Sequence, residues 1–196
     1  MITSGNFFYP IYKHDSCLYS RRVELNHRRL EQLLAAQALA VADRVREATQ
    51  AASAQEGSGP AALVHLKAHP GGSVGDLERV VGLSQTGAGR LVDRLAEAGL
   101  VERRAGRDGR TQALLLTREG LKAAARVLEL RAKAVAPLLE HLTPAERLDL
   151  ERLLERIVHG LAHDRPGALR VCRLCDRAAC YSGPGCPLDH AAQTAQ

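Results

Sequence analysis

The chain has 196 residues, of which 45% are hydrophobic and 25% are charged. This composition can build a hydrophobic core and excludes a disordered chain. Its longest uncharged run, residues 1–12, falls short of the roughly 18 residues that a membrane helix needs. The N-terminus also lacks the basic-then-apolar pattern of a signal peptide. We therefore expect a cytoplasmic protein with no membrane partner.

The formal net charge is +5, and all but four of the 27 basic residues are arginines. A mildly basic chain is compatible with an anionic partner, and the guanidinium group suits phosphates and guanine edges. A GC-rich genome also favours arginine codons, so the arginine count alone does not establish an anionic partner. The abundance of Ala and Leu predicts a mostly α fold.

The first 20 residues differ in composition from the rest of the chain. They hold five of the six aromatic side chains, whereas residues 20–171 contain none. The core must then be built from Leu, Val and Ala. We interpret residues 1–20 as a flexible arm, or as the result of a start codon placed too early.

The hydrophobic pattern predicts six helices and, between the fourth and the fifth, two strands. The helices are expected over residues 21–54, 61–68, 74–81, 84–98, 118–142 and 144–162. The strands are expected over residues 100–104 and 111–117, with a turn rich in Gly and Arg between them. The third and fourth helices are joined by a tight turn. The result is an α+β fold with a winged helix-turn-helix, a unit that places its second helix in the major groove of DNA.

Two stretches of sequence, in register with each other, resemble the MarR family of transcriptional regulators. The first, residues 83–104, reads LSQTGAGRLVDRLAEAGLVERR, and the second, residues 108–120, reads DGRTQALLLTREG. The positions that match in the second stretch are Asp108, Arg110, Leu116, Thr117 and Gly120. Gly109 and Thr111 depart from the family pattern, which has Arg and Ala there.

The resemblance covers about residues 21–163 and implies a domain layout. Residues 59–117 would form the winged helix-turn-helix, and residues 21–58 and 118–163 would form long dimerisation helices. It further implies a homodimer that binds double-stranded DNA and catalyses no reaction. Residues 164–196 form a Cys-rich tail that is not part of the common pattern of the family.

The candidate DNA contacts lie on the recognition helix and in the wing. On the helix they are Gln85, Thr86, Gly87, Gly89, Arg90 and Arg94, and in the wing Arg104, Arg107 and Arg110. Arg90 is the first choice for a base or phosphate contact. Each helical glycine costs about 1 kcal/mol relative to Ala. The two glycines therefore indicate either a close approach of the backbone to DNA or neutral drift.

The tail carries four cysteines, Cys172, Cys175, Cys180 and Cys186, with the spacing C-x2-C-x4-C-x5-C-P. Four thiolates on a short segment can wrap one metal or cluster. The Cys-Pro ending favours an iron–sulfur cluster over zinc and resembles the cluster loop of a redox-sensing MerR-type regulator. Redox-active thiols or a disulfide remain the alternative. We expect Arg170, Arg173 and Arg177 to lower the pKa of the thiols.

Other chemistry-bearing residues predict less. The pairs His65/His69 and His159/His163 have helical i, i+4 spacing, but with no third ligand in sequence we expect solvated or capping roles. No nucleotide-binding loop, nucleophile motif or acid/base pair occurs, so the protein is not expected to be an enzyme.

The sequence thus predicts a homodimeric repressor that binds an inverted repeat and takes a redox or metal input through its tail. One alternative is a regulator that responds to a small molecule and uses the tail as a structural zinc clip. Another, of a different class, is a cluster-carrying redox protein in which the wing is only a scaffold. The sequence points to no particular operator or effector.

Overall fold

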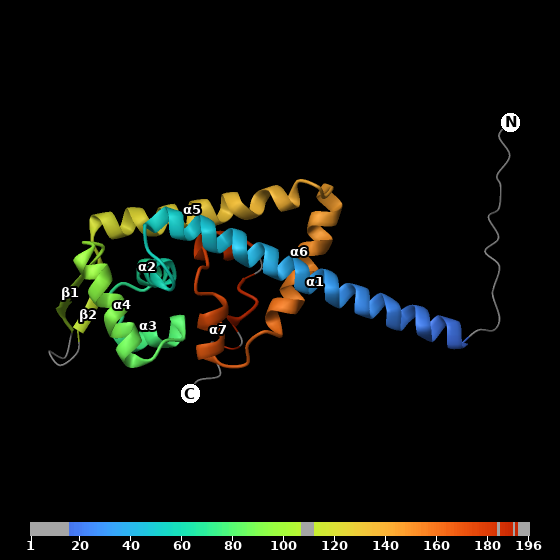
Figure 1. Ribbon diagram of the computed structural model, residues 1–196, viewed down its shortest axis with the longest axis horizontal. Helices are drawn as coiled ribbons and strands as arrows, with labels where there is room; N and C mark the ends of the chain where they lie inside the picture. The colour runs from blue at the N-terminus through green and yellow to red at the C-terminus, as the bar shows by residue number, and fades with distance from the viewer. Residues whose placement is uncertain (1–15, 107–111, 184, 190, 192–196) are drawn as a thin grey trace. The chain divides into compact units, whose positions relative to one another are not determined.

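The computed structural model of the chain describes residues 16–106, 112–183, 185–189 and 191, and the side chains from residue 27 onward (Figure 1). The chain divides into two units, residues 1–42 and 43–196, and each is described by itself. None of the helices in the described ranges is long and apolar enough to cross a membrane. The helices are α1 (Ser16–Ser53), α2 (Gly59–Ala68), α3 (Val74–Val81), α4 (Gln85–Glu97), α5 (Arg118–Leu139), α6 (Pro144–His159), α7 (Arg165–Val171) and α8 (Arg177–Cys180). The strands are β1 (Val101–Ala105) and β2 (Gln112–Leu116).

The first unit contains the N-terminal part of α1. The helix begins at Ser16, inside the segment that the sequence assigned to an arm, and residues 1–15 lie outside the described ranges. Large apolar side chains of this part of the helix are exposed, namely Leu30, Leu33, Leu34 and Leu39.

The core of the second unit is built by α2, α3, α4, α5 and the two strands. Its buried members are small or aliphatic, as the absence of aromatic residues from the body requires: Ala62, Leu63, Leu66, Leu77, Leu91, Val92, Leu95, Val101, Leu114 and Ala124. Strands β1 and β2 pair antiparallel, from Val101 opposite Leu116 to Ala105 opposite Gln112. Gly72 adds one further bridge to Leu114, which ties the segment before α3 to the sheet.

The helix-turn-helix begins and ends at well-formed caps. The Ser73 hydroxyl accepts a hydrogen bond from the Asp76 N–H, and the Asp76 carboxylate accepts one from the Ser73 N–H. This capping box fixes the start of α3. Helix α3 ends at Gly82, whose φ of +67° is the left-handed conformation that glycine adopts without strain. Ser84 then caps α4, so the tight turn predicted from the sequence is present.

The two helices after the wing are long and mostly solvent-exposed. Helix α5 continues past Pro137 for only two residues. Thr143 and Glu146 form the capping box of α6. Helix α6 has 16 residues, and none of them is buried in the single chain. A helix with this apolar content and no buried residue lacks its packing partner.

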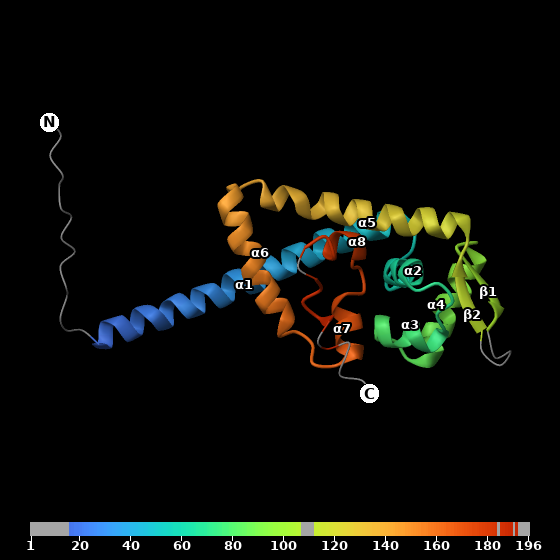
Figure 2. The same ribbon diagram turned by 180° about the vertical axis from the view of Figure 1, so that it is seen from behind.

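The tail contains two short helices that the sequence did not predict. Asp164 caps α7, and Asp176 caps α8. Helix α7 packs against α3, and both views of the ribbon show the two helices side by side (Figures 1 and 2). The tail therefore folds back onto the helix-turn-helix of its own chain.

Candidate nucleic-acid interface and cysteine cluster

Helix α4 buries one face and exposes the other. The buried side chains are Ala88, Leu91, Val92 and Leu95. The Ser84 hydroxyl accepts a hydrogen bond from the Gly87 N–H at 3.2 Å, which starts the helix. The exposed face carries four of the predicted contacts, Gln85, Thr86, Arg90 and Arg94. Side chains with hydrogen-bonding groups are thus presented together on an accessible helix.

The two glycines of α4 differ in their surroundings. A Cβ at Gly87 would lie 3.4 Å from the Cβ of Leu83 and from the Ser84 hydroxyl, a tight contact. A Cβ at Gly89 would meet nothing within 4 Å. The chain itself therefore leaves little spare room at position 87 and open space at position 89.

Ion pairs distinguish the arginines of this surface. Arg103 of β1 pairs with Asp93 of α4 at 2.5 Å, and Arg104 pairs with Glu102 at 2.7 Å. Arg90 and Arg94 have no carboxylate partner among the described residues. Their charges are therefore available to an external anion. Arg107, Asp108 and Arg110 lie outside the described residues.

The residues Thr117 and Gly120 of the second motif hold the sheet against α5. The Thr117 hydroxyl donates a hydrogen bond to the Gly99 carbonyl at 2.7 Å and accepts one from the Gly120 N–H at 3.0 Å. The Thr117 N–H donates to the Leu100 carbonyl at 3.0 Å. A Cβ on Gly120 would overlap that same carbonyl oxygen. This part of the motif is therefore structural, because only glycine permits such a close approach.

The structure brings the four tail cysteines together. Cys172 ends α7, Cys175 lies in the turn that follows, Cys180 is the last residue of α8, and Cys186 lies in the loop beyond. All four thiols are free and half-buried. Hydrogen bonds join neighbouring thiols along the series from Cys172 to Cys186, so the cluster predicted from spacing alone exists as a spatial group.

The pKa values of the thiols diverge rather than falling together. A hydrogen bond from Cys172 lowers the pKa of Cys175 to about 6, with help from the charge of Arg131 on α5. The same hydrogen bond raises the pKa of Cys172. Burial and the charges of its neighbours raise the pKa of Cys180 to about 12. The expectation that tail arginines depress all the thiol pKa values is wrong for Cys172 and Cys180.

The donor set of the cluster suits a soft metal, although its geometry is not that of a closed site. Four sulfur donors in one small group are the chemistry of structural zinc and of iron–sulfur clusters. Among the described residues, however, no three His, Cys, Asp or Glu side chains are arranged around a common metal position. To hold a metal or cluster, the thiols must rotate from their chain of hydrogen bonds toward one point.

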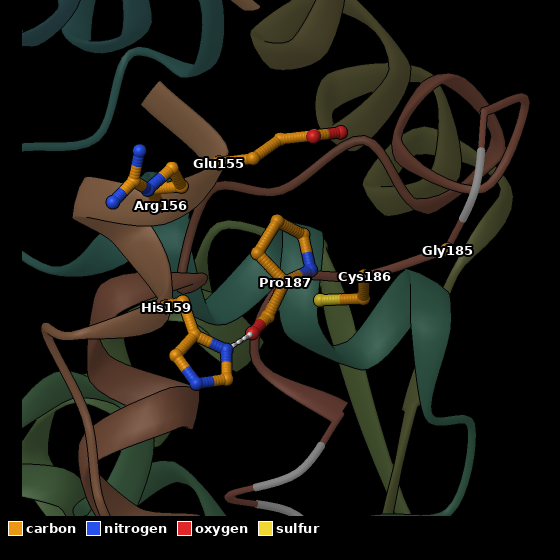
Figure 3. Close-up of a pocket in the computed structure, with 6 residues that line it drawn as sticks. All are labelled: Glu155, Arg156, His159, Gly185, Cys186 and Pro187. Atoms are coloured by element: carbon orange, nitrogen blue, oxygen red, sulfur yellow. Dashed lines mark hydrogen bonds between the residues drawn. The ribbon is translucent and has the colours of Figure 1, made fainter. Parts of the chain in front are cut away.

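A small core joins the cysteine cluster to α6. It consists of Ala162, Ala168, Leu188 and Ala191, with Val158, Cys172 and Cys186 packed against it. His159 of α6 hydrogen-bonds through Nδ1 with the Pro187 carbonyl at 3.2 Å. A cavity of about 420 Å³ lies between α6 and this loop, and Figure 3 shows Cys186 and Pro187 on its wall opposite Glu155 and Arg156.

On its other side the tail borders two further cavities. One, of about 500 Å³, is lined by His65 of α2, by His69 at its C-cap, by Asp76 and Arg79 of α3, and by Arg165 at the start of α7. The other, of about 100 Å³, brings the same histidines next to Cys172, Cys175 and Cys186.

The two histidine pairs identified in the sequence are each engaged within the chain. The rings of His65 and His69 lie 4.6 Å apart. Burial, with a smaller contribution from His69, lowers the pKa of His65 to about 4. His159 of the second pair contacts the tail loop, as described above.

Comparison with known proteins shows which family the helix-turn-helix region resembles. The model of the MarR family matches residues 60–111, a range that includes α3, α4 and β1 and ends just before β2. A MarR family protein from Bacillus stearothermophilus is 27% identical with a TM-score of 0.60, over 68% of this chain and 94% of that one. Residues 60–111 are thus of the MarR type, and the chain has the winged helix-turn-helix fold of MarR-family regulators.

Two further solved structures show the same fold. YusO from Bacillus subtilis has a TM-score of 0.56 at 20% identity, over 75% of this chain and 99% of that one. Rv1404 from Mycobacterium tuberculosis has a TM-score of 0.53 at 24% identity, over 77% and 98%. A search of curated proteins found no match. The family match ends before α5, so it does not bear on the cysteines of this MarR-family protein.

Sequence reasoning missed the contact between the tail and the helix-turn-helix. The signal for α7 was present in Asp164-Arg165-Pro166, a capping residue followed by Pro in the first turn. The structure confirms that cap, because the Asp164 carboxylate accepts a hydrogen bond from the Gly167 N–H at 2.7 Å. Nothing in the local pattern indicates that α7 packs on α3.

Proposed function

We propose that this MarR-family regulator is a homodimeric repressor that binds an inverted repeat in double-stranded DNA. The observation that carries the proposal is the exposed polar face of α4, on which Arg90 and Arg94 have no partner among the described residues. A helix of this kind fits the major groove, where arginine reads guanine edges. The Arg103–Asp93 pair would hold the wing beside it for backbone contacts.

Unpaired apolar surface supports the homodimer. Helix α6 buries none of its residues, yet it exposes several large apolar side chains: Leu148, Leu153, Leu154 and Ile157. Leu148 alone is 69% exposed. Exposed apolar patches of this kind mark interaction surfaces. A second copy of the chain would cover them and would set two recognition helices on one face, as a two-fold symmetric operator requires.

Selection of bound oligonucleotides from a random pool, followed by footprinting of the selected sequence, tests the DNA-binding proposal. We expect an inverted repeat with half-site centres about 10–10.5 base pairs apart. Arg90→Ala should weaken binding by about 1–3 kcal/mol and relax one position in each half-site. Arg126→Ala, on the exposed surface of α5, is the matched control and should bind normally. Failure to enrich any inverted repeat would contradict the proposal.

We further propose that the four tail cysteines bind an iron–sulfur cluster or zinc and supply the regulatory input. The support is the chemistry of the donor set and the proximity of Cys172, Cys175, Cys180 and Cys186. Such a group would draw the four sulfur atoms around one centre. It would bind them in their deprotonated, thiolate form. In a repressor, loss of the group would then change the affinity for the operator.

Anaerobic purification with metal analysis and a visible spectrum tests the cysteine proposal. A coloured protein containing iron and sulfide supports the cluster, and a colourless protein with one zinc per chain supports the zinc version. Cys175→Ser should abolish binding, whereas Cys17→Ser, outside the tail, should not. Metal-free wild-type protein would contradict both versions and leave redox-active thiols. An arginine variant of α4 tests the alternative of a redox carrier. If the variant keeps its metal but loses DNA binding, the protein is a regulator rather than a redox carrier.

A further inference from the structure

We propose that the cysteine cluster acts on DNA binding through direct contact within one chain, by setting whether α7 stays packed on α3. This inference rests on the proposed function and names the route by which its regulation works. It concerns a contact between the tail and the first helix of the helix-turn-helix, and so does not depend on how the two protomers are spaced.

The first step is the contact itself. Helix α7 packs on α3, and Leu169 lies on the wall of the larger cavity, which α3 also lines, and of the smaller one between the tail and α2. Arg170 approaches the C-cap of α3, because a Cβ on Gly82 would lie 3.8 Å from its Cδ. Asp76 and Arg79 of α3 line the larger cavity together with Leu169 of α7.

The second step is that the cysteines hold α7 in place. The Cys172 N–H donates to the Ala168 carbonyl at 2.9 Å and closes the last turn of α7. Cys172 and Cys186 both pack on the small core that contains Ala168 and Leu188. A metal, a cluster or a disulfide that joins these thiols would therefore restrain the end of α7 directly.

The third step is that α7 has little stability of its own, so support from linked thiols would matter. It has seven residues, and isolated helices shorter than about 12–15 residues are marginal in water. The buried part of the tail core consists of three alanines and one leucine. So small a core stabilises little by itself, which is why domains of this size use metals or disulfides. Linking the cysteines would therefore stabilise an α7 that is only weakly held in the free-thiol state.

The last step carries the effect to the DNA-binding surface. Helix α3 packs directly on α4, and its side chains Leu77 and Val80 are buried. When α7 leaves α3, one side of α3 loses its packing partner. Greater mobility of α3 would then change the order of α4 and the affinity for DNA.

Hydrogen exchange of the protein without DNA tests this route. We would compare the amides of α3 in the wild-type protein, in Cys175→Ser, in Leu169→Asp and in the double variant. Cys175 lies outside the small tail core, so its substitution changes the thiol site and leaves that core intact. Val171→Asp, at a 38% exposed position of α7 that lines neither cavity, is the matched control.

We expect Cys175→Ser and Leu169→Asp each to speed exchange in α3 roughly fivefold or more, the lower end of common coupling effects. The double variant should be no faster than Leu169→Asp, and Val171→Asp should match the wild type. The amides around Ala124 in α5 report global stability. If they also lose protection in Leu169→Asp, the milder Leu169→Ala replaces it and should show the same selective effect on α3.

The outcomes separate this route from the proposed function. Unchanged exchange in α3 of Cys175→Ser overturns the route, even if the same variant shows altered operator affinity. Additive effects in the double variant also overturn it, because the two changes would then act independently. Coupled effects on α3 support the route, whether or not an operator is found.

Discussion

Arg103 on β1 donates a hydrogen bond to Asp93 on α4 at 2.5 Å and so joins the wing to the recognition helix. Because the pair is partly exposed, we expect Asp93→Asn to cost about 1 kcal/mol of stability or less. Operator affinity should fall several-fold more than that stability change would explain, because the wing loses its fixed position. Asp149→Asn breaks a comparable surface pair with Arg152 and serves as the control. Equal operator affinity for both variants and the wild type would show that the pair does not orient the wing.

The close approach of Gly120 to the Leu100 carbonyl predicts a large effect of a single methyl group. Gly120→Ala should lower the free energy of unfolding by roughly 1–3 kcal/mol, because backbone rather than a movable side chain blocks the space. Gly89→Ala has open space and should raise it by about 0.5–1 kcal/mol through better helix propensity. Urea denaturation at one fixed protein concentration compares the two. A stable Gly120→Ala protein would contradict this packing.

Gly89→Ala also distinguishes the two interpretations of glycine in α4. If the backbone of α4 approaches DNA closely at this position, the added methyl group should weaken operator binding while stabilising the free protein. We expect this result, because the chain itself leaves space for a side chain there. Unchanged affinity, measured by fluorescence anisotropy with a labelled operator, would assign the glycine to drift.

The low pKa of His65 predicts a pH dependence of stability. Burial lowers it to about 4 from the ordinary 6.5, so the unfolded chain binds a proton between these values and the folded chain does not. The stability that neutral His65 permits is present above pH 6.5 and is lost as the pH falls toward 4. The negative charge of Asp76 raises the pKa of His65 and so opposes the effect of burial, which is larger.

Denaturation at pH 7 and pH 5 with a chelator present would measure this effect free of metal binding to the tail. His65→Gln should reduce the difference between the two pH values. His141→Gln, at an exposed position between α5 and α6, should leave it as in the wild type. Equal pH dependence in both variants would exclude His65 as its source.

Local signals explain what the sequence predicted correctly. Caps such as Ser73 and Thr143 act within one turn of helix, so the starts of α3 and α6 could be read directly. The apolar period of α4 likewise identified its buried face, and with it the exposed face that carries Arg90.

Long-range relations could not be read in this way. The pairing of Arg103 with Asp93, and the carbonyl that forbids a side chain at Gly120, depend on how the wing folds back onto α4 and α5. The pKa of Cys175 is lowered chiefly by the hydrogen bond with Cys172, and also by the charge of Arg131, which is remote in sequence. The arginines near Cys175 in sequence had instead predicted that the pKa values of all four thiols would be lowered. Spacing predicted the cysteine cluster itself, but the surface against which the tail packs is set by tertiary structure.

The central claim is that the state of the tail cysteines sets the affinity of this MarR-family regulator for its operator. The most direct measurement is a titration of the selected operator with four preparations: as-isolated protein, oxidised protein, chelated protein and the Cys175→Ser variant. We predict that the as-isolated protein differs from the other three by roughly 5–150-fold, the usual range of coupling between two sites. Cys175→Ser should match the chelated protein. Equal affinity in all four preparations would contradict the claim and leave the tail as a structural clip.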